Sequence, residues 1–345
     1  MVTLFWLRVP SLAGTVPPIV LASTAWWQPN GPVSSIAVLV SALAILFWIF
    51  FRWIPNDRVG VVEKWWSLAG SVPEGRIIAT GPEAGYRVDI LRGGLHFGWW
   101  RWQYAIHAVP LVSIPEGKIG YVFARDGEPL PASQTLARVV ASNNFQDARA
   151  FLGVAAPGAA GQKGRQRAIL REGVYAINPA LFTVISENAV FALKAVQTRA
   201  EQESLGRWLA ELRAVQGFDP VVIGRSRAEA TEDAGEDRVD SIGIVTVHDG
   251  PSLSPGEIIA PTVGGDLSDP DYHNNYQDPE AFLRAGGRRG RQHMPLTDGT
   301  YFVNRWFATV EKVPKTVVPI GSVGVVVSYI GRAGADISGQ AFRHG

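Results

Sequence analysis

A stretch that occurs twice decides the fold of this chain: NNFQDARAFL at residues 143–152 returns as NNYQDPEAFL at residues 274–283. Matched blocks flank both copies. Upstream, Ile119-Gly120-Tyr121-Val122 with Asp126-Gly127 corresponds to Ile242-Gly243-Ile244-Val245 with Asp249-Gly250. Downstream, Gly164-Arg165-Gln166 corresponds to Gly290-Arg291-Gln292, and Gly173, Tyr175, Asn178, Thr183 and Val184 correspond to Gly299, Tyr301, Asn304, Thr309 and Val310. Three matched blocks in one order indicate two copies of a module of about 75–80 residues.

The Ile/Val-Gly-x-Val element at the start of each copy has the pattern of a strand. It occurs twice more, at Val59-Gly60-Val61-Val62 and at Val323-Gly324-Val325-Val326. Short β-branched runs after Pro/Gly turns predict strands, and a glycine inside them permits a bulge or a close backbone approach. We therefore expect an α+β protein, in which repeated modules of antiparallel or mixed sheet carry short helices.

Two helices are predicted from their start signals. In each repeat, the Asp that precedes Ala-Phe-Leu predicts a short capped helix, and Asp278-Pro279 in the second copy fits proline in its first turn. Thr198 with Glu201 forms a capping box, after which apolar residues follow a helical period as far as Gly217. The expected order is an anchor (1–54), a first module (55–118), a second module that is repeat copy 1 (119–197), a helix (198–217), a mobile loop (218–241), a third module that is repeat copy 2 (242–318) and the start of a truncated module (319–345).

The N-terminal region is strongly apolar. Residues 33–51 contain no charge, and Arg52 ends the run. This length predicts one membrane crossing over residues 33–53, with Trp26, Trp27, Trp48 and Trp53 at the interface. Residues 9–27 are also uncharged but contain three prolines, so either they form a hairpin with the crossing or they lie at the interface. The basic residues flank the apolar segments, which predicts a plasma-membrane protein whose large domain faces the cytoplasm.

Several of these motifs resemble the stomatin–prohibitin–flotillin superfamily (band 7, or SPFH, domains), and its flotillin branch most. They are Ile54-Pro55-Asn56-Asp57-Arg58-Val59-Gly60 directly after the apolar run, Gly94-Leu95-His96-Phe97, and Ile114-Pro115-Glu116-Gly117-Lys118-Ile119-Gly120. The resemblance implies a non-enzymatic scaffold that forms large homo-oligomers and organises membrane microdomains or membrane proteins such as proteases. The long Ala/Glu-rich coiled coil of that family is absent, and the fourth Val-Gly-x-Val element starts a module that stops before its closing turn.

The residue inventory gives little support for catalysis. There is no cysteine, the six histidines lack metal-ligand spacing, and the nucleophile pattern Gly-x-Ser-x-Gly is missing. We therefore predict no catalytic residue, no metal and no cofactor. Lys and Arg number 32 against 31 Asp and Glu, which argues against a nucleic-acid-coating protein.

Two basic clusters occupy corresponding places in the repeats and are candidates for contact with anionic lipid. They are Lys163, Arg165, Arg167 and Arg171 in the first copy, and Arg284, Arg288, Arg289 and Arg291 in the second. Solvated loop charges are the plainer explanation of the same residues. Three function classes remain open: a membrane scaffold with the lipid bilayer as partner, a membrane-tethered binding module for a cell-envelope partner, and a membrane-bound hydrolase.

Overall fold

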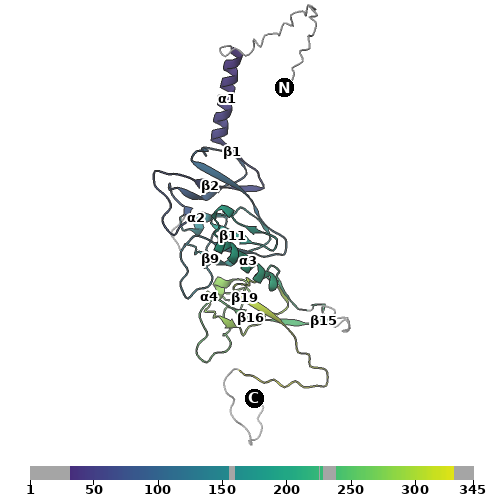
Figure 1. Cartoon of the computed structure of the whole chain (residues 1–345). Coiled ribbons are helices and arrows are strands. Elements are labelled where there is room, and N and C mark those ends of the chain that lie inside the picture. Colours follow the sequence, from purple (N-terminus) through teal and green to yellow (C-terminus); the bar gives the residue numbers. More distant parts are fainter. Residues whose placement is uncertain (1–31, 155–159, 225, 228–237, 330–345) are drawn as a thin grey trace, which may run out of the picture. The chain divides into compact units, whose positions relative to one another are not determined.

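The computed structural model describes residues 32–154, 160–224, 226–227 and 238–329 (Figure 1). The chain divides into two compact units: Met1–Arg52 with Phe97–Arg101, and Trp53–His96 with Trp102–Gly345. Among the described residues strands predominate over helices, which are few and mostly short. The predicted α+β class with an N-terminal anchor is therefore wrong.

Helix α1 spans Pro32–Phe50 in the first unit, and strand β1, Phe51–Ile54, follows it directly in the chain. Phe97 and Trp100 pack against Phe50, with ring centroids 5.9 and 5.7 Å apart, and the Arg101 guanidinium lies 4.1 Å from the centre of the Trp48 ring. Apolar side chains along α1 are exposed on every side of the helix: Ile36, Val38, Leu39, Val40, Leu43, Ile45, Leu46, Phe47 and Trp48.

The membrane crossing predicted over residues 33–53 is contradicted by the structure. Among the described residues, no helix combines the length and the apolar character needed to span a bilayer. Part of the reason is that the apolar run is shared between two elements, because the helix ends at Phe50 and the next four residues form a strand. The first apolar segment, 9–27, lies outside the described residues, as do Trp26 and Trp27.

The second unit contains three successive sheets, which we call the first, second and third modules. The first sheet has the order β3(Ile78–Ala79)-β4(Gly85–Leu91)-β2(Arg58–Lys64)-β6(Tyr104–Pro110). The second has the order β12(Val190–Phe191)-β11(Phe182–Ile185)-β8(Gly120–Ala124)-β9(Gly164–Leu170), and the third β17(Gly290–Arg291)-β16(Ser241–Val247)-β19(Ala308–Pro314). All pairings in them are antiparallel except β3 with β4.

Each sheet is accompanied by a two-stranded ribbon built from the Gly-x-Tyr or Gly-x-His element. The pairs are β1 with β5(Gly94–Phe97), β7(Val112–Ile114) with β10(Gly173–Tyr175), and β13(Val221–Ile223) with β18(Gly299–Tyr301). A further hairpin joins β14(Ser226–Arg227) and β15(Arg238–Val239). The segment predicted as a mobile loop, 218–241, thus begins with a paired strand, and residues 228–237 lie outside the described ones.

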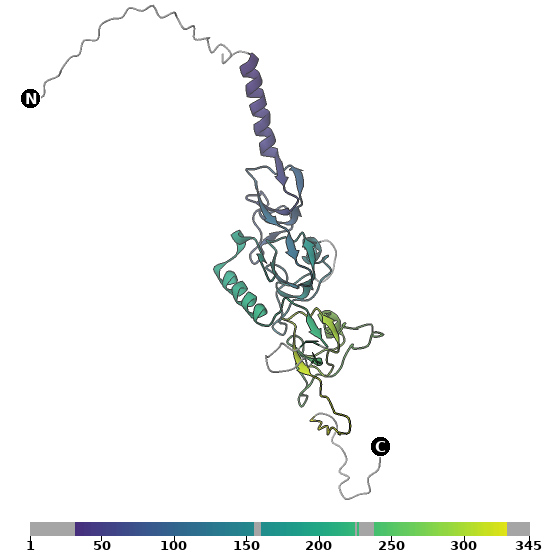
Figure 2. The same ribbon diagram turned by 90° about the vertical axis from the view of Figure 1, so that its right-hand side faces the viewer.

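The helices lie where the sequence places them. Short helices α2(Ala148–Phe151) and α4(Pro279–Arg284) follow the repeated Asn-Asn stretch, and η1(Lys194–Val196) precedes α3(Arg199–Ala214), which lies beside the second module (Figure 2). The capping box of Thr198 with Glu201 is confirmed, and so is proline in the first turn of α4.

The repeated Asn-Asn-aromatic stretch forms one left-handed turn in both copies. Asn143, Asn144 and Phe145 have φ angles of 48, 52 and 63°, and the matched residues have 46, 53 and 65°. Asparagine tolerates this region better than most residues. The turn carries the aromatic residue inward, since Phe145 and its counterpart Tyr276 are both buried. Because this uncommon backbone conformation occurs in both copies with nearly identical φ angles, it belongs to the conserved structure of the two described copies of the module.

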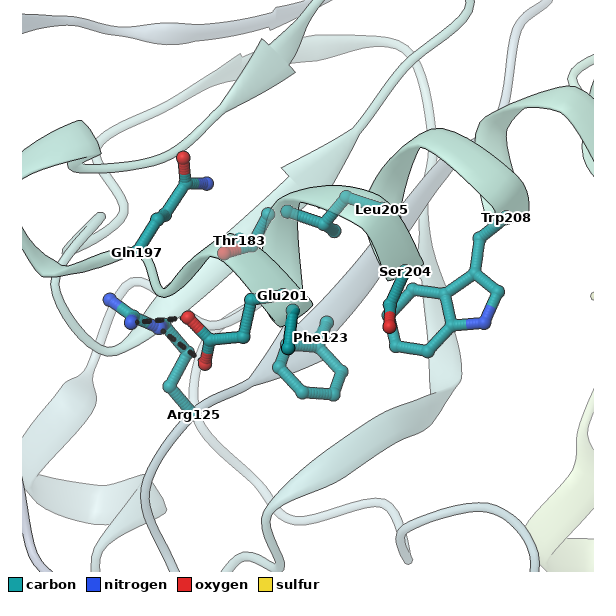
Figure 3. A pocket seen from close by; sticks show the side chains of 9 residues that line it. Phe123, Arg125, Thr183, Gln197, Glu201, Ser204, Leu205 and Trp208 are labelled. Carbon is teal, nitrogen blue, oxygen red and sulfur yellow. Dashed lines mark hydrogen bonds and ion pairs between the residues drawn. The ribbon is translucent and has the colours of Figure 1, made fainter.

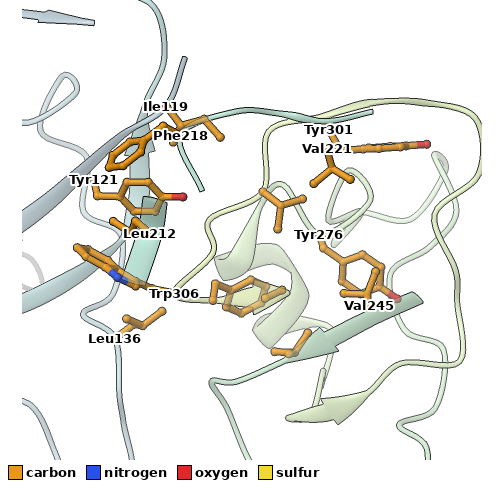
Figure 4. Close-up of a cluster of buried hydrophobic side chains, with 14 of the residues drawn as sticks. Ile119, Tyr121, Leu136, Leu212, Phe218, Val221, Val245, Tyr276, Tyr301 and Trp306 are labelled. Atoms are coloured by element: carbon orange, nitrogen blue, oxygen red, sulfur yellow. The ribbon is translucent and has the colours of Figure 1, made fainter. Parts of the chain in front are cut away.

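The modules share two hydrophobic cores. One core contains residues of the first and second modules, including Val61, Val88, Val122 and Phe182. The other joins the second and third modules with α3, and Figure 4 shows Tyr121, Leu212 and Trp306 of this second core close together. Because no module encloses its own core, each depends on its neighbour for burial.

Candidate functional site at the module joints

Two polar contacts are repeated wherever one module meets the next, and we call each such place a joint. The first contact is made by the aspartate of the Asp-Gly turn. At the first joint, Asp126 Oδ2 accepts hydrogen bonds from the backbone N–H groups of Ile77 (2.8 Å) and Ile78 (2.9 Å). At the second joint, Asp249 Oδ1 accepts from the N–H (3.2 Å) and the hydroxyl (2.8 Å) of Thr135. Both aspartates are buried.

The second contact is made by the asparagine of the Gly-x-Tyr-x-x-Asn element. Asn178 Nδ2 donates to the carbonyl oxygens of Arg87 and Val88, both at 3.0 Å. Asn304 Nδ2 donates in the same way to the carbonyls of Gln166 (3.1 Å) and Arg167 (2.8 Å). In both modules the asparagine Oδ1 accepts a backbone N–H two residues later, which holds the amide in this orientation.

The accepting carbonyls lie at a β-bulge. The register of β2 with β4 shifts between Val61 and Glu63, and that of β8 with β9 shifts between Tyr121 and Phe123. A bulge releases carbonyl groups from the sheet ladder. The next module's asparagine supplies the missing donors, and a buried carbonyl without one would be costly. The buried aspartate and asparagine that the two repeats share therefore hold neighbouring modules together.

At the second joint, Arg167 adds an ionic contact. Its Nε lies 2.8 Å from Asp249 and its Nη1 lies 2.8 Å from Glu280 of α4. The Arg167 side chain is only 8% exposed, so it lies inside the joint and does not contribute to a free basic surface. Glu280 also accepts the backbone N–H of Val139 at 2.7 Å.

The other basic residues proposed for lipid contact are dispersed and mostly paired. Arg165 lies between the rings of Trp208 and Trp306, and Arg171 lies 3.3 Å from the centre of the Phe302 ring. In the second cluster, three arginines form ion pairs and Arg289 bonds a serine: Arg284 with Asp271, Arg288 with Glu257, Arg291 with Glu311, and Arg289 with Ser252. Lys163 is exposed. Contact of the exposed cations with anionic lipid stays a prediction.

A cavity of about 320 Å³ opens where α3 meets the second joint. Arg165 and Arg305 both line it, and neither forms an ion pair in the part of the chain that the structure describes. Burial lowers the pKa of each guanidinium from its ordinary value. Two buried atoms here, Arg305 Nε and Trp306 Nε1, have no hydrogen-bond partner in the described ranges of the chain. The remaining lining residues are Thr135, Glu211, Leu212, Val215, His248 and Thr309.

A smaller cavity of about 180 Å³ lies between α3 and strands β8 and β11 (Figure 3). Arg125, whose side chain is 2% exposed, pairs there with Glu201 at 2.7 Å. Glu201 is the capping-box residue, so one carboxylate fixes both the start of α3 and the guanidinium. Figure 3 shows the third guanidinium nitrogen turned away from Glu201, and this Nη1 atom is buried with no hydrogen-bond partner among the described residues.

Sequence reasoning identified the repeated aspartates and asparagines but not their role. Their positions in the repeat were the available signal. The cavity arginine Arg305 carried no signal, because no matched basic residue marks it. His273, one of the six histidines that lack metal-ligand spacing, is fully buried. Its Nε2 lies 2.9 Å from the Val263 carbonyl, and its Nδ1 accepts the Tyr276 N–H at 2.9 Å.

Within the described ranges, no group of three or more His, Cys, Asp or Glu side chains lies close enough together to hold a metal ion. Of the four tryptophans predicted at a membrane interface, Trp48 and Trp53 are described, and both are exposed. No protein family, curated protein or solved structure matches this chain, so its resemblance to the flotillin branch stays a prediction.

Proposed function

We propose that this chain is a non-enzymatic scaffold whose tandem modules present a continuous protein surface to partners. One observation carries the proposal. The aspartate of the Asp-Gly turn and the asparagine of the Gly-x-Tyr-x-x-Asn element, which the two repeats share, are buried at the joints, where hydrogen bonds between modules occupy them. A catalytic repeat would instead direct its shared polar groups towards an accessible cavity. The resemblance to scaffold proteins agrees with this proposal.

Self-assembly is part of the proposal. Helix α1 exposes apolar side chains on every side, and a helix that is apolar all round is normally covered by other apolar surface. Copies of the same chain offer such a surface, because each brings one α1. A homo-oligomer would gather several sets of modules around one centre, as a scaffold requires.

Native mass measurement of the purified full chain tests this proposal. A discrete assembly of several copies, in buffer and in detergent, is the expected result. A matched variant with Leu39 and Leu46 replaced by Gln should reduce the number of copies while the modules stay folded. A monomer in both conditions would contradict the scaffold and favour a monovalent binding module. An assembly in buffer that becomes a monomer in detergent micelles would show that detergent can replace the second copy as the cover of α1.

The cavity at the second joint favours a second candidate function, the binding of a small anion. Arg165 and Arg305, which form no ion pair with any described carboxylate, line it together with Glu211, and apolar groups of Leu212, Val215 and Trp306 complete the wall. This combination suits a carboxylate with an apolar body. Titration with benzoate, followed by tryptophan fluorescence, tests it. Saturable quenching that is lost in Arg305→Gln supports binding, and quenching unchanged in that variant excludes this cavity.

A further inference from the structure

The strand that opens each of the first two modules is preceded by the same closed turn. Arg58 N–H bonds the Pro55 carbonyl at 3.1 Å, and Lys118 N–H bonds the Pro115 carbonyl at 3.2 Å. Five residues after the proline, a glycine lies directly against the apolar residue that precedes the proline. At Gly120 a β-carbon would lie 2.6 Å from Ile114 Cδ1, so a larger residue there would have to displace the Ile114 side chain.

Residues 318–324 adopt this turn a third time. Ser322 N–H bonds the Pro319 carbonyl at 3.0 Å, and Gly321 has a φ of 83°, close to the 71° of Gly117. A β-carbon on Gly324 would lie 3.2 Å from Val318, which corresponds to Ile114. The start of a further module is therefore already folded as far as its glycine.

The strand that should follow this turn has no partner strand in the described part of the chain, which contains no strand after β19. Val325 and Val326 are 89 and 91% exposed, whereas their counterparts Tyr121 and Val122 in β8 are fully buried between β9 and β11. Exposed apolar β-branched runs of this kind accept an added strand.

The third module also retains the feature that receives an asparagine. Gln292 Nε2 bonds the Arg288 and Gly290 carbonyls, both at 2.8 Å, as Gln166 bonds the carbonyls of Gln162 and Gly164. The carbonyls of Gln292 and His293 thus correspond to those of Gln166 and Arg167, which bind Asn304. Among the described residues, no donor reaches these two carbonyls.

We propose that residues 316–327, together with the Gln292 and His293 carbonyls, form a docking surface for a Gly-x-Tyr-x-x-Asn segment followed by an apolar strand. The Gly-x-Tyr part pairs with residues 316–318, as β10 pairs with β7, and the apolar strand pairs with residues 325–327, as β11 pairs with β8. The asparagine donates to the two carbonyls. Position 330 is Ile where the second and third modules have Asp126 and Asp249, so the asparagine is the polar contact available. This proposal rests on the repeated sequence elements and does not require the self-assembly proposed above.

The experiment uses the full chain and a synthetic peptide of residues 171–186, which contains the segment of the second module. The chain has no cysteine, so a disulfide between one cysteine introduced in the chain and one in the peptide reports the pairing register of the two strands. Val122 pairs with Val184, and Ser113 pairs with Val174. Val326→Cys in the chain should therefore form a disulfide with a Val184→Cys peptide, and Val317→Cys with a Val174→Cys peptide. Directly paired strand residues lie within disulfide range.

The two matched combinations (326 with 184, and 317 with 174) should cross-link at least about 10-fold faster than the two crossed combinations (326 with 174, and 317 with 184), because the crossed cysteines would lie in different strand pairs, beyond disulfide reach. The Asn178→Ala peptide should bind roughly 10-fold more weakly, because it cannot reach the two carbonyls. Equal rates in all four combinations, or no peptide cross-linking, would overturn the docking surface. Faster disulfide formation between two Val326→Cys chains would overturn the occupant and show that the tails pair with each other.

Discussion

Replacing Asn304 by Ala removes the amide that joins the third module to the second. The side chain is 2% exposed and donates to two carbonyls at the β9 bulge. Each buried carbonyl left without a donor costs about 1–3 kcal/mol, and water entering the gap recovers part of this. We expect Asn304→Ala to lower the free energy of unfolding of the second joint by about 2–4 kcal/mol.

Asn304→Asp keeps nearly the same side-chain shape but puts an acceptor in place of the donor that faces the two carbonyls. A carboxylate oxygen replaces the donor and faces the Gln166 and Arg167 oxygens, so this variant should be at least as unstable at neutral pH as the alanine variant. Asn188→Ala, at an exposed loop position, is the matched control and should stay within about 0.5 kcal/mol of the parent chain.

Urea unfolding, followed by circular dichroism and tryptophan fluorescence, measures the change, and hydrogen exchange at the Trp306 amide localises it. That amide donates to Asn304 Oδ1 at 2.9 Å, so its protection should fall in the alanine variant before the first module is affected. A change below about 0.5 kcal/mol would refute the role given to the joints, since surface substitutions alone cause that much.

Three further predictions concern other contacts. Burial lowers the pKa of His273, so its contribution to stability should be complete above about pH 6.5 and decrease as the pH falls towards the lowered folded-state value. Thermal unfolding at pH 7.5 and 5.5 should show that the melting temperature falls less on acidification in His273→Ser than in the parent chain. Serine is the matched substitute because Ser142 occupies the same position in the other copy. Glu201→Gln keeps the helix cap but leaves the buried Arg125 without a counter-charge, which should cost about 1–3 kcal/mol in urea unfolding; an unchanged midpoint would disprove it. At Asn275, with a φ of 53°, substitution by Ala should cost about 1 kcal/mol and substitution by Gly less, and equal losses would argue against backbone strain.

Local signals in the sequence were sufficient for several elements. The Ile-Gly-x-Val strands, the capping box of α3 and the proline at the start of α4 all depend on neighbours within a few residues. The apolar run before Arg52 gave a wrong prediction for the same reason. Its composition was considered over residues 33–53 as one helix, whereas the backbone changes from helix to strand after Phe50.

The sequence by itself determined that a module is repeated and where its turns lie, because glycine, proline and asparagine impose backbone angles without help from distant residues. Only the tertiary structure decided what the repeated polar residues do. Asp249 meets Thr135 across 114 residues of chain, and Asn304 meets Arg167 across 137. A hydrogen bond at such separation depends on how two sheets pack, and no local pattern records that packing. The same holds for Arg165 and Arg305, which share one cavity only because α3 and two modules meet there.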